Sequence, residues 1–117
     1  MSNKKYTVYH NNRCSKSRSA LAYLDDQKAD YEVIEYLKTP LDSSEITDLL
    51  AQLNIPASEL IRKGEPEFKE HFQGKKPTEK EWIDAMVKFP KLIERPIIVR
   101  NGKAIIGRPV EKIGELD

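Results

Sequence analysis

The single cysteine of the chain, Cys14, stands where a predicted strand gives way to a predicted helix. The first backbone N–H groups of a helix have no partner within it, and their partial positive charge favours a thiolate over a thiol. Arg13, Lys16 and Arg18 add positive charge around the cysteine. His10 is close enough in sequence to reach the same loop. A reactive thiol is therefore predicted, although many free cysteines are only small buried side chains.

Ser17 occupies the position at which a Cys-x-x-Cys motif would carry its second thiol. A chain with one cysteine forms neither an internal disulfide nor a zinc site built on several thiolates. Any covalent adduct on Cys14 must therefore be resolved by a thiol from another molecule, such as glutathione. Ser17 could equally be an ordinary residue of the first helical turn.

Three arginines, Arg62, Arg95 and Arg108, lie at the edges of predicted elements and close to a glycine or proline. Such arginines usually only solvate a surface. If the three converged on a thiolate, their guanidinium groups would bind an oxyanion through bidentate contacts and stabilise charge developing on it. The sequence has no Gly-rich phosphate loop and no paired histidine ligands, so neither a nucleotide site nor a metal site is predicted.

The cysteine and the arginines must be positioned by the predicted strands, helices and hairpin. Residues 6–10 and 31–37 are rich in β-branched and aromatic side chains, and residues 15–28 between them show helical spacing. A strand, a helix and a strand over this length are typical of a parallel βαβ unit. Asn101-Gly102 joins two apolar runs and predicts an antiparallel hairpin, which is followed by a short helix at residues 110–116.

The middle of the chain is expected to be helical, over residues 42–90. Asp42 with Glu45, and Thr78 with Glu81, are capping-box pairs that each precede a helical pattern. Residues 64–77 between them are polar and rich in helix breakers. The element order resembles a thioredoxin-like α/β fold, with a mixed four-stranded sheet, flanking helices and an inserted helical subdomain.

Composition limits the classes of function. The 117 residues predict one domain, and 20 Lys and Arg against 19 Asp and Glu give a net charge of +1. This balance argues against tight, sequence-independent binding to nucleic acid, which needs a basic excess. The apolar runs are too short to cross a membrane, and we recognise no secretory signal. A reducing cytoplasm is therefore the expected location.

Four motifs together resemble those of the glutaredoxin-dependent arsenate reductases. They are His10-Asn11-x-x-Cys14-x-x-Ser17-Arg18, Leu60-Ile61-Arg62-Lys63, Lys91-Leu92-Ile93-Glu94-Arg95-Pro96-Ile97 and Gly107-Arg108-Pro109. The resemblance runs from about Lys5 to the end of the chain. Asn12 replaces a proline that many members carry, and Arg13 and Lys16 replace smaller residues. The chain is thus similar to the divergent members of that family.

The resemblance implies that Cys14 is the nucleophile. It also implies that Arg62, Arg95 and Arg108 surround the bound oxyanion, and that His10, Ser17 and Arg18 lower the pKa of the cysteine and orient it. Arsenate, or a related oxyanion, would be the substrate, glutathione the co-substrate and glutaredoxin the partner, with no bound cofactor. The Arg95-Pro96 peptide bond is expected to be cis and to face the Cys14 loop.

A second function remains open, because the same fold also serves transcriptional regulators that bind RNA polymerase. Those regulators usually carry a Cys-x-x-Cys switch, so Ser17 argues against a redox-switched version of that role. The arginine-containing motifs favour the enzyme. Neither observation excludes a binding module.

Overall fold

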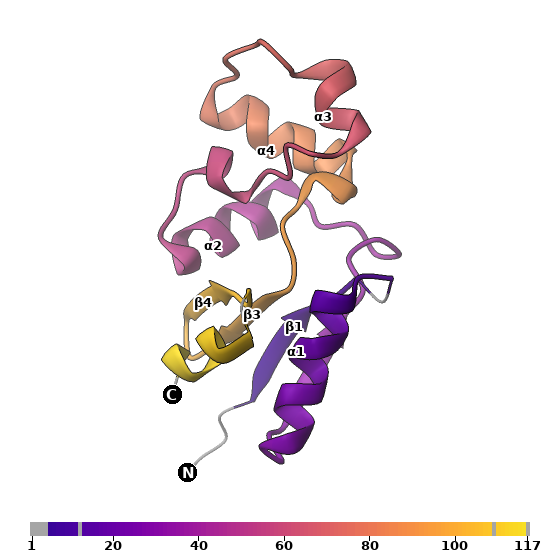
Figure 1. The fold of residues 1–117 in the computed structure, drawn as a ribbon. Helices are drawn as coiled ribbons and strands as arrows, with labels where there is room; N and C mark the ends of the chain where they lie inside the picture. The colour runs from indigo at the N-terminus through magenta and orange to yellow at the C-terminus, as the bar shows by residue number, and fades with distance from the viewer. Residues whose placement is uncertain (1–4, 12, 109, 117) are drawn as a thin grey trace. The chain divides into compact units, whose positions relative to one another are not determined.

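The computed structural model describes residues 5–11, 13–108 and 110–116, so Asn12 and Pro109 of the motifs lie outside the described residues. The chain divides into two compact units (Figure 1). The first contains residues 1–39 and 95–117, and the second contains residues 40–94. The second unit corresponds closely to the predicted helical insertion at about 42–90. That the whole chain forms one domain stays a prediction.

The first unit is built on the mixed four-stranded sheet that the sequence predicts. Its strands are β1 (Tyr6–Tyr9), β2 (Tyr31–Ile34), β3 (Ile97–Arg100) and β4 (Lys103–Ile106), in the order β2-β1-β3-β4. β1 and β2 are parallel, whereas β3 is antiparallel to both β1 and β4. β2 ends earlier than predicted because the chain turns, and the Lys38 N–H donates to the Glu35 carbonyl at 2.9 Å.

Two helical segments pack against one face of this sheet. They are α1 (Ser15–Asp26) and the 3-10 helix η3 (Val110–Leu116). Val8 and Ile98 from the sheet, Leu24 from α1 and Ile113 from η3 share the buried core. α1 ends two residues before the predicted end, because Lys28 has a left-handed backbone with φ 54°. The predicted terminal helix is a 3-10 helix.

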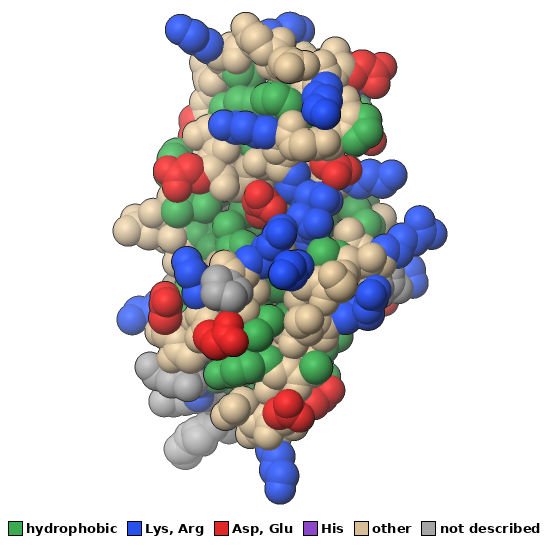
Figure 2. All heavy atoms as spheres, viewed as in Figure 1, with side chains coloured by type: hydrophobic (Ala, Val, Ile, Leu, Met, Phe, Trp, Pro, Cys, Tyr) green, Lys and Arg blue, Asp and Glu red, His purple; other side chains and the backbone are tan. Residues whose placement is uncertain are grey.

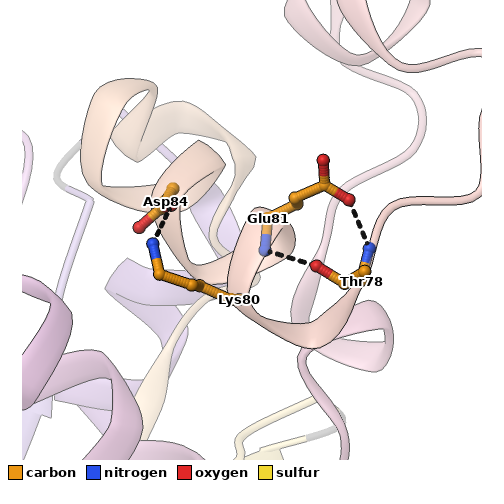
Figure 3. A network of polar contacts seen from close by, with 4 residues as sticks. All are labelled: Thr78, Lys80, Glu81 and Asp84. Carbon is orange, nitrogen blue, oxygen red and sulfur yellow. Dashed lines mark hydrogen bonds and ion pairs between the residues drawn. The ribbon is translucent and has the colours of Figure 1, made fainter.

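The second unit is helical, as predicted. Its elements are α2 (Ser43–Leu53), η1 (Ala57–Leu60), α3 (Pro66–His71), α4 (Glu79–Lys88) and η2 (Pro90–Leu92). Both predicted capping boxes form, and in α4 the Glu81 N–H donates to Thr78 Oγ1 at 3.2 Å while the Thr78 N–H donates to Glu81 Oε1 at 2.7 Å (Figure 3). The segment 64–77, although rich in helix breakers, contains α3, which starts at Pro66, and Phe68 of this helix stacks on Trp82.

The outer surface carries both signs of charge. Figure 2 shows side chains of Lys and Arg and side chains of Asp and Glu on the face that it draws. Among the described residues, no helix combines the length and the apolar character that crossing a membrane would need.

Gly107 is required by packing rather than by backbone conformation. A Cβ built at this residue would lie 2.6 Å from Ile98 Cδ1 and 3.3 Å from Pro96 Cγ. Ile98 is completely buried and cannot move aside freely. We expect Gly107→Ala to lower the free energy of unfolding by about 1–3 kcal/mol, measured by chemical denaturation. Gly64→Ala is the control, because its Cβ would meet nothing within 4 Å, and an equal effect of both changes would contradict this account.

Candidate active site

The loop between β1 and α1 is organised by Asn11. Its carbonyl accepts the Cys14 N–H at 3.0 Å, and its Oδ1 accepts the Arg13 N–H at 3.0 Å. Its own N–H donates to Ser17 Oγ at 3.3 Å. These bonds hold Cys14 at the start of α1. Asn residues favour turns, and the tendency of an Asn side chain to bond the backbone two residues on was a usable signal for this loop.

Cys14 is the N-cap residue of α1 and is half-buried, with an extended backbone (φ −100°, ψ 122°). Burial raises the pKa of the Cys14 thiol, but the backbone N–H groups of Ser17 and Lys16 and the Arg95 side chain together lower it below its ordinary value. The sulfur itself makes no capping hydrogen bond of normal geometry. The helix N-terminus therefore favours the thiolate while leaving the sulfur available for reaction.

Arg95 contacts the sulfur directly: its Nε–H donates to Cys14 Sγ at 3.2 Å. This arginine comes immediately before β3, and β3 pairs with β1 so that Ile97 lies opposite Tyr9. The sheet thus brings the start of β3 to the end of β1, where the Cys14 loop begins. The predicted cis peptide bond between Arg95 and Pro96 is present.

Arg108 follows the end of β4 in the same unit. Ile97 and Ile106 are opposite each other in the β3–β4 pair, and the Gly107 N–H donates to the Pro96 carbonyl at 2.9 Å. This register continues the pairing toward Arg95 and Arg108, so the two arginines lie on neighbouring backbone segments. The Arg108 side chain is exposed.

His10 directly follows β1. Its side chain is only 5% exposed, and Nδ1 is buried without a hydrogen-bond partner. Burial lowers the pKa of His10, Glu35 raises it, and the positive charge of Arg18 lowers it again, so that the net direction is downward. Burial thus favours the neutral imidazole, and the role of His10 in lowering the pKa of Cys14 stays a prediction. The Arg18 side chain is exposed on α1.

Ser17 is fully buried, and two of its groups face the Cys14 loop. Its Oγ accepts the Asn11 N–H, as described above, and its backbone N–H favours the thiolate of Cys14. The hydroxyl therefore fixes the loop, while the backbone acts on the sulfur.

Arg62 belongs to the second unit. There its Nη2 forms an ion pair with Glu65 at 3.0 Å, and its Nη1 donates to the Lys91 carbonyl at 3.3 Å. Its backbone N–H donates to the Leu92 carbonyl at 2.7 Å. The guanidinium group thus has two partners within its own unit.

The described residues hold no group of three or more His, Cys, Asp and Glu side chains arranged to bind a metal ion. What the first unit does combine is a thiol of lowered pKa, a guanidinium donor on its sulfur and a helix N-terminus. This combination can activate a thiolate and accommodate an anion beside it.

The pKa of Cys14 can be measured through its rate of alkylation by iodoacetamide. We expect the inflection of rate against pH to lie below about 8.5, the ordinary value for a cysteine thiol. Arg95→Gln should raise it, because the guanidinium donates to the thiolate. Lys103→Gln removes a positive charge at the start of β4 and is the control. An inflection at the ordinary value would contradict an activated thiolate.

Known proteins resemble this chain in sequence. The model of the ArsC family matches residues 9–116. The uncharacterized protein YfgD of Escherichia coli strain K12 is 46% identical over 115 residues, covering 97% of each chain. The arsenate reductase of Neisseria meningitidis serogroup A is 38% identical over 108 residues, covering 91% of this chain and 92% of the relative.

A solved structure gives the same result for the fold. The arsenate reductase from Vibrio cholerae superposes with a TM-score of 0.94 at 38% identity, covering 99% of this chain and all of the other. The fold is therefore thioredoxin-like, with a mixed four-stranded sheet and flanking helices. On the family model and these relatives together, the chain belongs to the ArsC family.

Proposed function

We propose that the protein reduces arsenate to arsenite with glutathione as co-substrate. Glutaredoxin is the proposed partner that regenerates the Cys14 thiol. The observation that carries the proposal is the 3.2 Å contact between Arg95 Nε and Cys14 Sγ at the N-terminus of α1. Relatives named arsenate reductase, at 34–38% identity over most of this chain, support the choice of substrate. The cytoplasm, where glutathione keeps thiols reduced, is the proposed location.

The first step forms a covalent bond to arsenic. The Cys14 thiolate attacks the arsenic(V) atom, an S–As bond forms, and one As–O bond breaks. The departing hydroxide takes a proton and becomes water. Arg95 and Arg108 carry the positive charge that a bound tetrahedral oxyanion requires, and guanidinium groups bind its oxygens in pairs.

The second step transfers the electrons. A glutathione thiolate attacks Cys14 Sγ, an S–S bond forms, and the S–As bond breaks with its electron pair remaining on arsenic. Arsenic(V) thus becomes arsenic(III) and leaves as arsenite, while the two sulfurs are oxidised to a mixed disulfide. A glutaredoxin thiolate then attacks the glutathione sulfur and releases the Cys14 thiolate.

The remaining residues have supporting roles in this proposal. Ser17 holds the loop and presents its N–H to the sulfur. Burial, with a smaller contribution from the charge of Arg18, lowers the pKa of His10. That Arg62 also binds the oxyanion stays a prediction. This prediction is tested by comparing the KM for arsenate of Arg62→Lys with that of the wild type, and a higher KM is expected if the guanidinium group contacts the oxyanion.

The proposed function is tested by NADPH oxidation in the presence of arsenate, glutathione, glutaredoxin and glutathione reductase. We expect NADPH to be consumed only when both arsenate and the protein are present. If there is no turnover but arsenate or phosphate still protects Cys14 from alkylation, the oxyanion site stands and arsenate is the wrong substrate. Absence of both turnover and protection would overturn the enzyme proposal in favour of a binding protein.

A further inference from the structure

The start of α1 is held in a different way from the starts of α2 and α4. In α2 the N-cap residue Asp42 accepts the Glu45 N–H at 2.8 Å. In α4 the N-cap residue Thr78 accepts the Glu81 N–H at 3.2 Å (Figure 3). The N-cap residue of α1 is Cys14, whose side chain makes no capping hydrogen bond. The residue with the reactive sulfur therefore does not itself fix the start of its helix.

Asn11 supplies the missing bonds from outside the helix. Its Oδ1 accepts the Arg13 N–H at 3.0 Å, and its backbone carbonyl accepts the Cys14 N–H at 3.0 Å. Together these two bonds close a tight turn that ends at Cys14. The Cys14 carbonyl then accepts the Arg18 N–H at 3.1 Å, which is the first hydrogen bond of α1. The turn that Asn11 fixes thus leads directly into the helix.

This turn determines which backbone groups act on the sulfur. The N–H of Cys14 is taken by the Asn11 carbonyl, whereas the N–H groups of Ser17 and Lys16 stabilise the thiolate and help to lower the pKa of Cys14. Both of these donors belong to α1, so their effect on the sulfur depends on where the turn places Cys14. Ser17 is fully buried, and its Oγ accepts the Asn11 N–H at 3.3 Å, which ties the turn back to the helix.

We infer that Asn11 is a positioning residue for Cys14: its side-chain carbonyl, bonded to the Arg13 N–H, holds the sulfur against the first N–H groups of α1. The backbone bonds of residue 11 can form with any side chain, whereas the bond from Oδ1 requires a short side chain that carries an acceptor. The inference goes beyond the proposed function, in which Asn11 has no role, and it applies to any reaction of the Cys14 thiolate. Asn11 acts through the backbone of its neighbours.

The test measures alkylation of Cys14 by iodoacetamide against pH in the full-length Asn11→Ala variant, which loses Oδ1 and keeps the backbone. We expect the inflection to rise by about one pH unit toward the ordinary thiol value, because misplaced N–H groups stabilise the thiolate less. Hydrogen exchange of the Cys14 amide should become about tenfold faster, because the turn that protects it opens more often. Asn11→Ser keeps an acceptor that forms this kind of turn more weakly, so its inflection should lie between the two.

Asn101→Ala is the matched control. Asn101 is an exposed asparagine in the turn between β3 and β4, and its φ of 54° is unfavourable for alanine. This variant should lose stability to urea and leave the alkylation inflection unchanged. A merely structural role of Asn11 would give the same result at position 11, namely lower stability with an unchanged inflection.

An unchanged inflection in Asn11→Ala would overturn the inference, as would an equal rise in the Asn101→Ala control. If Asn11→Ala does not fold, Asn11→Ser takes its place, and an inflection no higher than that of the wild type would then overturn it. Alkylation needs no arsenate, so either result leaves the proposed function to its own test. Conversely, a protein without arsenate turnover would lose the proposed substrate and could still show the shift in the Asn11 variants.

Discussion

Cys14→Ser is expected to abolish turnover and, at the same time, to make the protein more stable. A serine hydroxyl is a far poorer nucleophile than a thiolate at neutral pH, so no adduct forms. Serine is also one of the best N-cap residues, and its Oγ can accept a first-turn N–H of α1 that the thiol leaves without a capping bond. We expect the free energy of unfolding to rise by about 1 kcal/mol, as measured by urea denaturation near pH 6.

The gain in stability should depend on pH. The folded protein lowers the pKa of Cys14, so the native state binds fewer protons than the unfolded state between the two pKa values. The wild type therefore becomes more stable as the pH rises from the folded pKa to the unfolded pKa, and this contribution is absent below that window. The advantage of Cys14→Ser should accordingly be largest near pH 6 and smaller near pH 9.

Cys14→Ala is the matched control for both effects. It also removes the nucleophile, so its turnover should be lost to the same extent, but alanine cannot cap the helix and its stability should not rise. Turnover in Cys14→Ser would contradict the assignment of the nucleophile. Equal stability of the serine and alanine variants would contradict the explanation that the serine hydroxyl at position 14 caps α1 and that the wild-type thiol does not.

The position of Cys14 could be predicted from sequence because the hydrophobic period changes from strand to helix at that point. Sequence also predicted the capping boxes of α2 and α4 and the hairpin at Asn101-Gly102. Each of these features depends on a few neighbouring residues and not on distant ones. α3 was missed because four of its six residues are polar or charged, and because it packs through Phe68 on Trp82, which is distant in sequence.

The charge of His10 and the contact of Arg95 depend on tertiary structure. The sequence places His10 near Cys14, but only the folded chain shows that the ring is buried and that its pKa falls. Arg95 and Cys14 are 81 residues apart, and the pairing of β1 with β3 brings them together. Local patterns identified Arg95 as a candidate anion binder, whereas its bond to the sulfur required the sheet register.

The second large effect is expected for Arg95→Lys, which keeps the charge and changes the geometry. The Nε–H of Arg95 donates to Cys14 Sγ, and the rest of the planar guanidinium group can bind an oxyanion at the same time. An ammonium group lacks this fixed fork. We expect kcat/KM for arsenate to fall about a hundredfold, which is typical for the loss of one preorganised donor to a developing charge.

Arg100→Lys is the control for this change, because Arg100 lies at the other end of β3 and donates to the Tyr6 hydroxyl at 2.7 Å. It should alter stability and leave kcat unchanged. Added guanidinium ion should partly restore turnover in Arg95→Ala but not in Cys14→Ser, because the ion can replace the missing donor and not the missing nucleophile. Without such recovery, and with the alkylation profile of Cys14 unchanged in Arg95→Ala, Arg95 would have only a structural role and the oxyanion would have to be bound elsewhere.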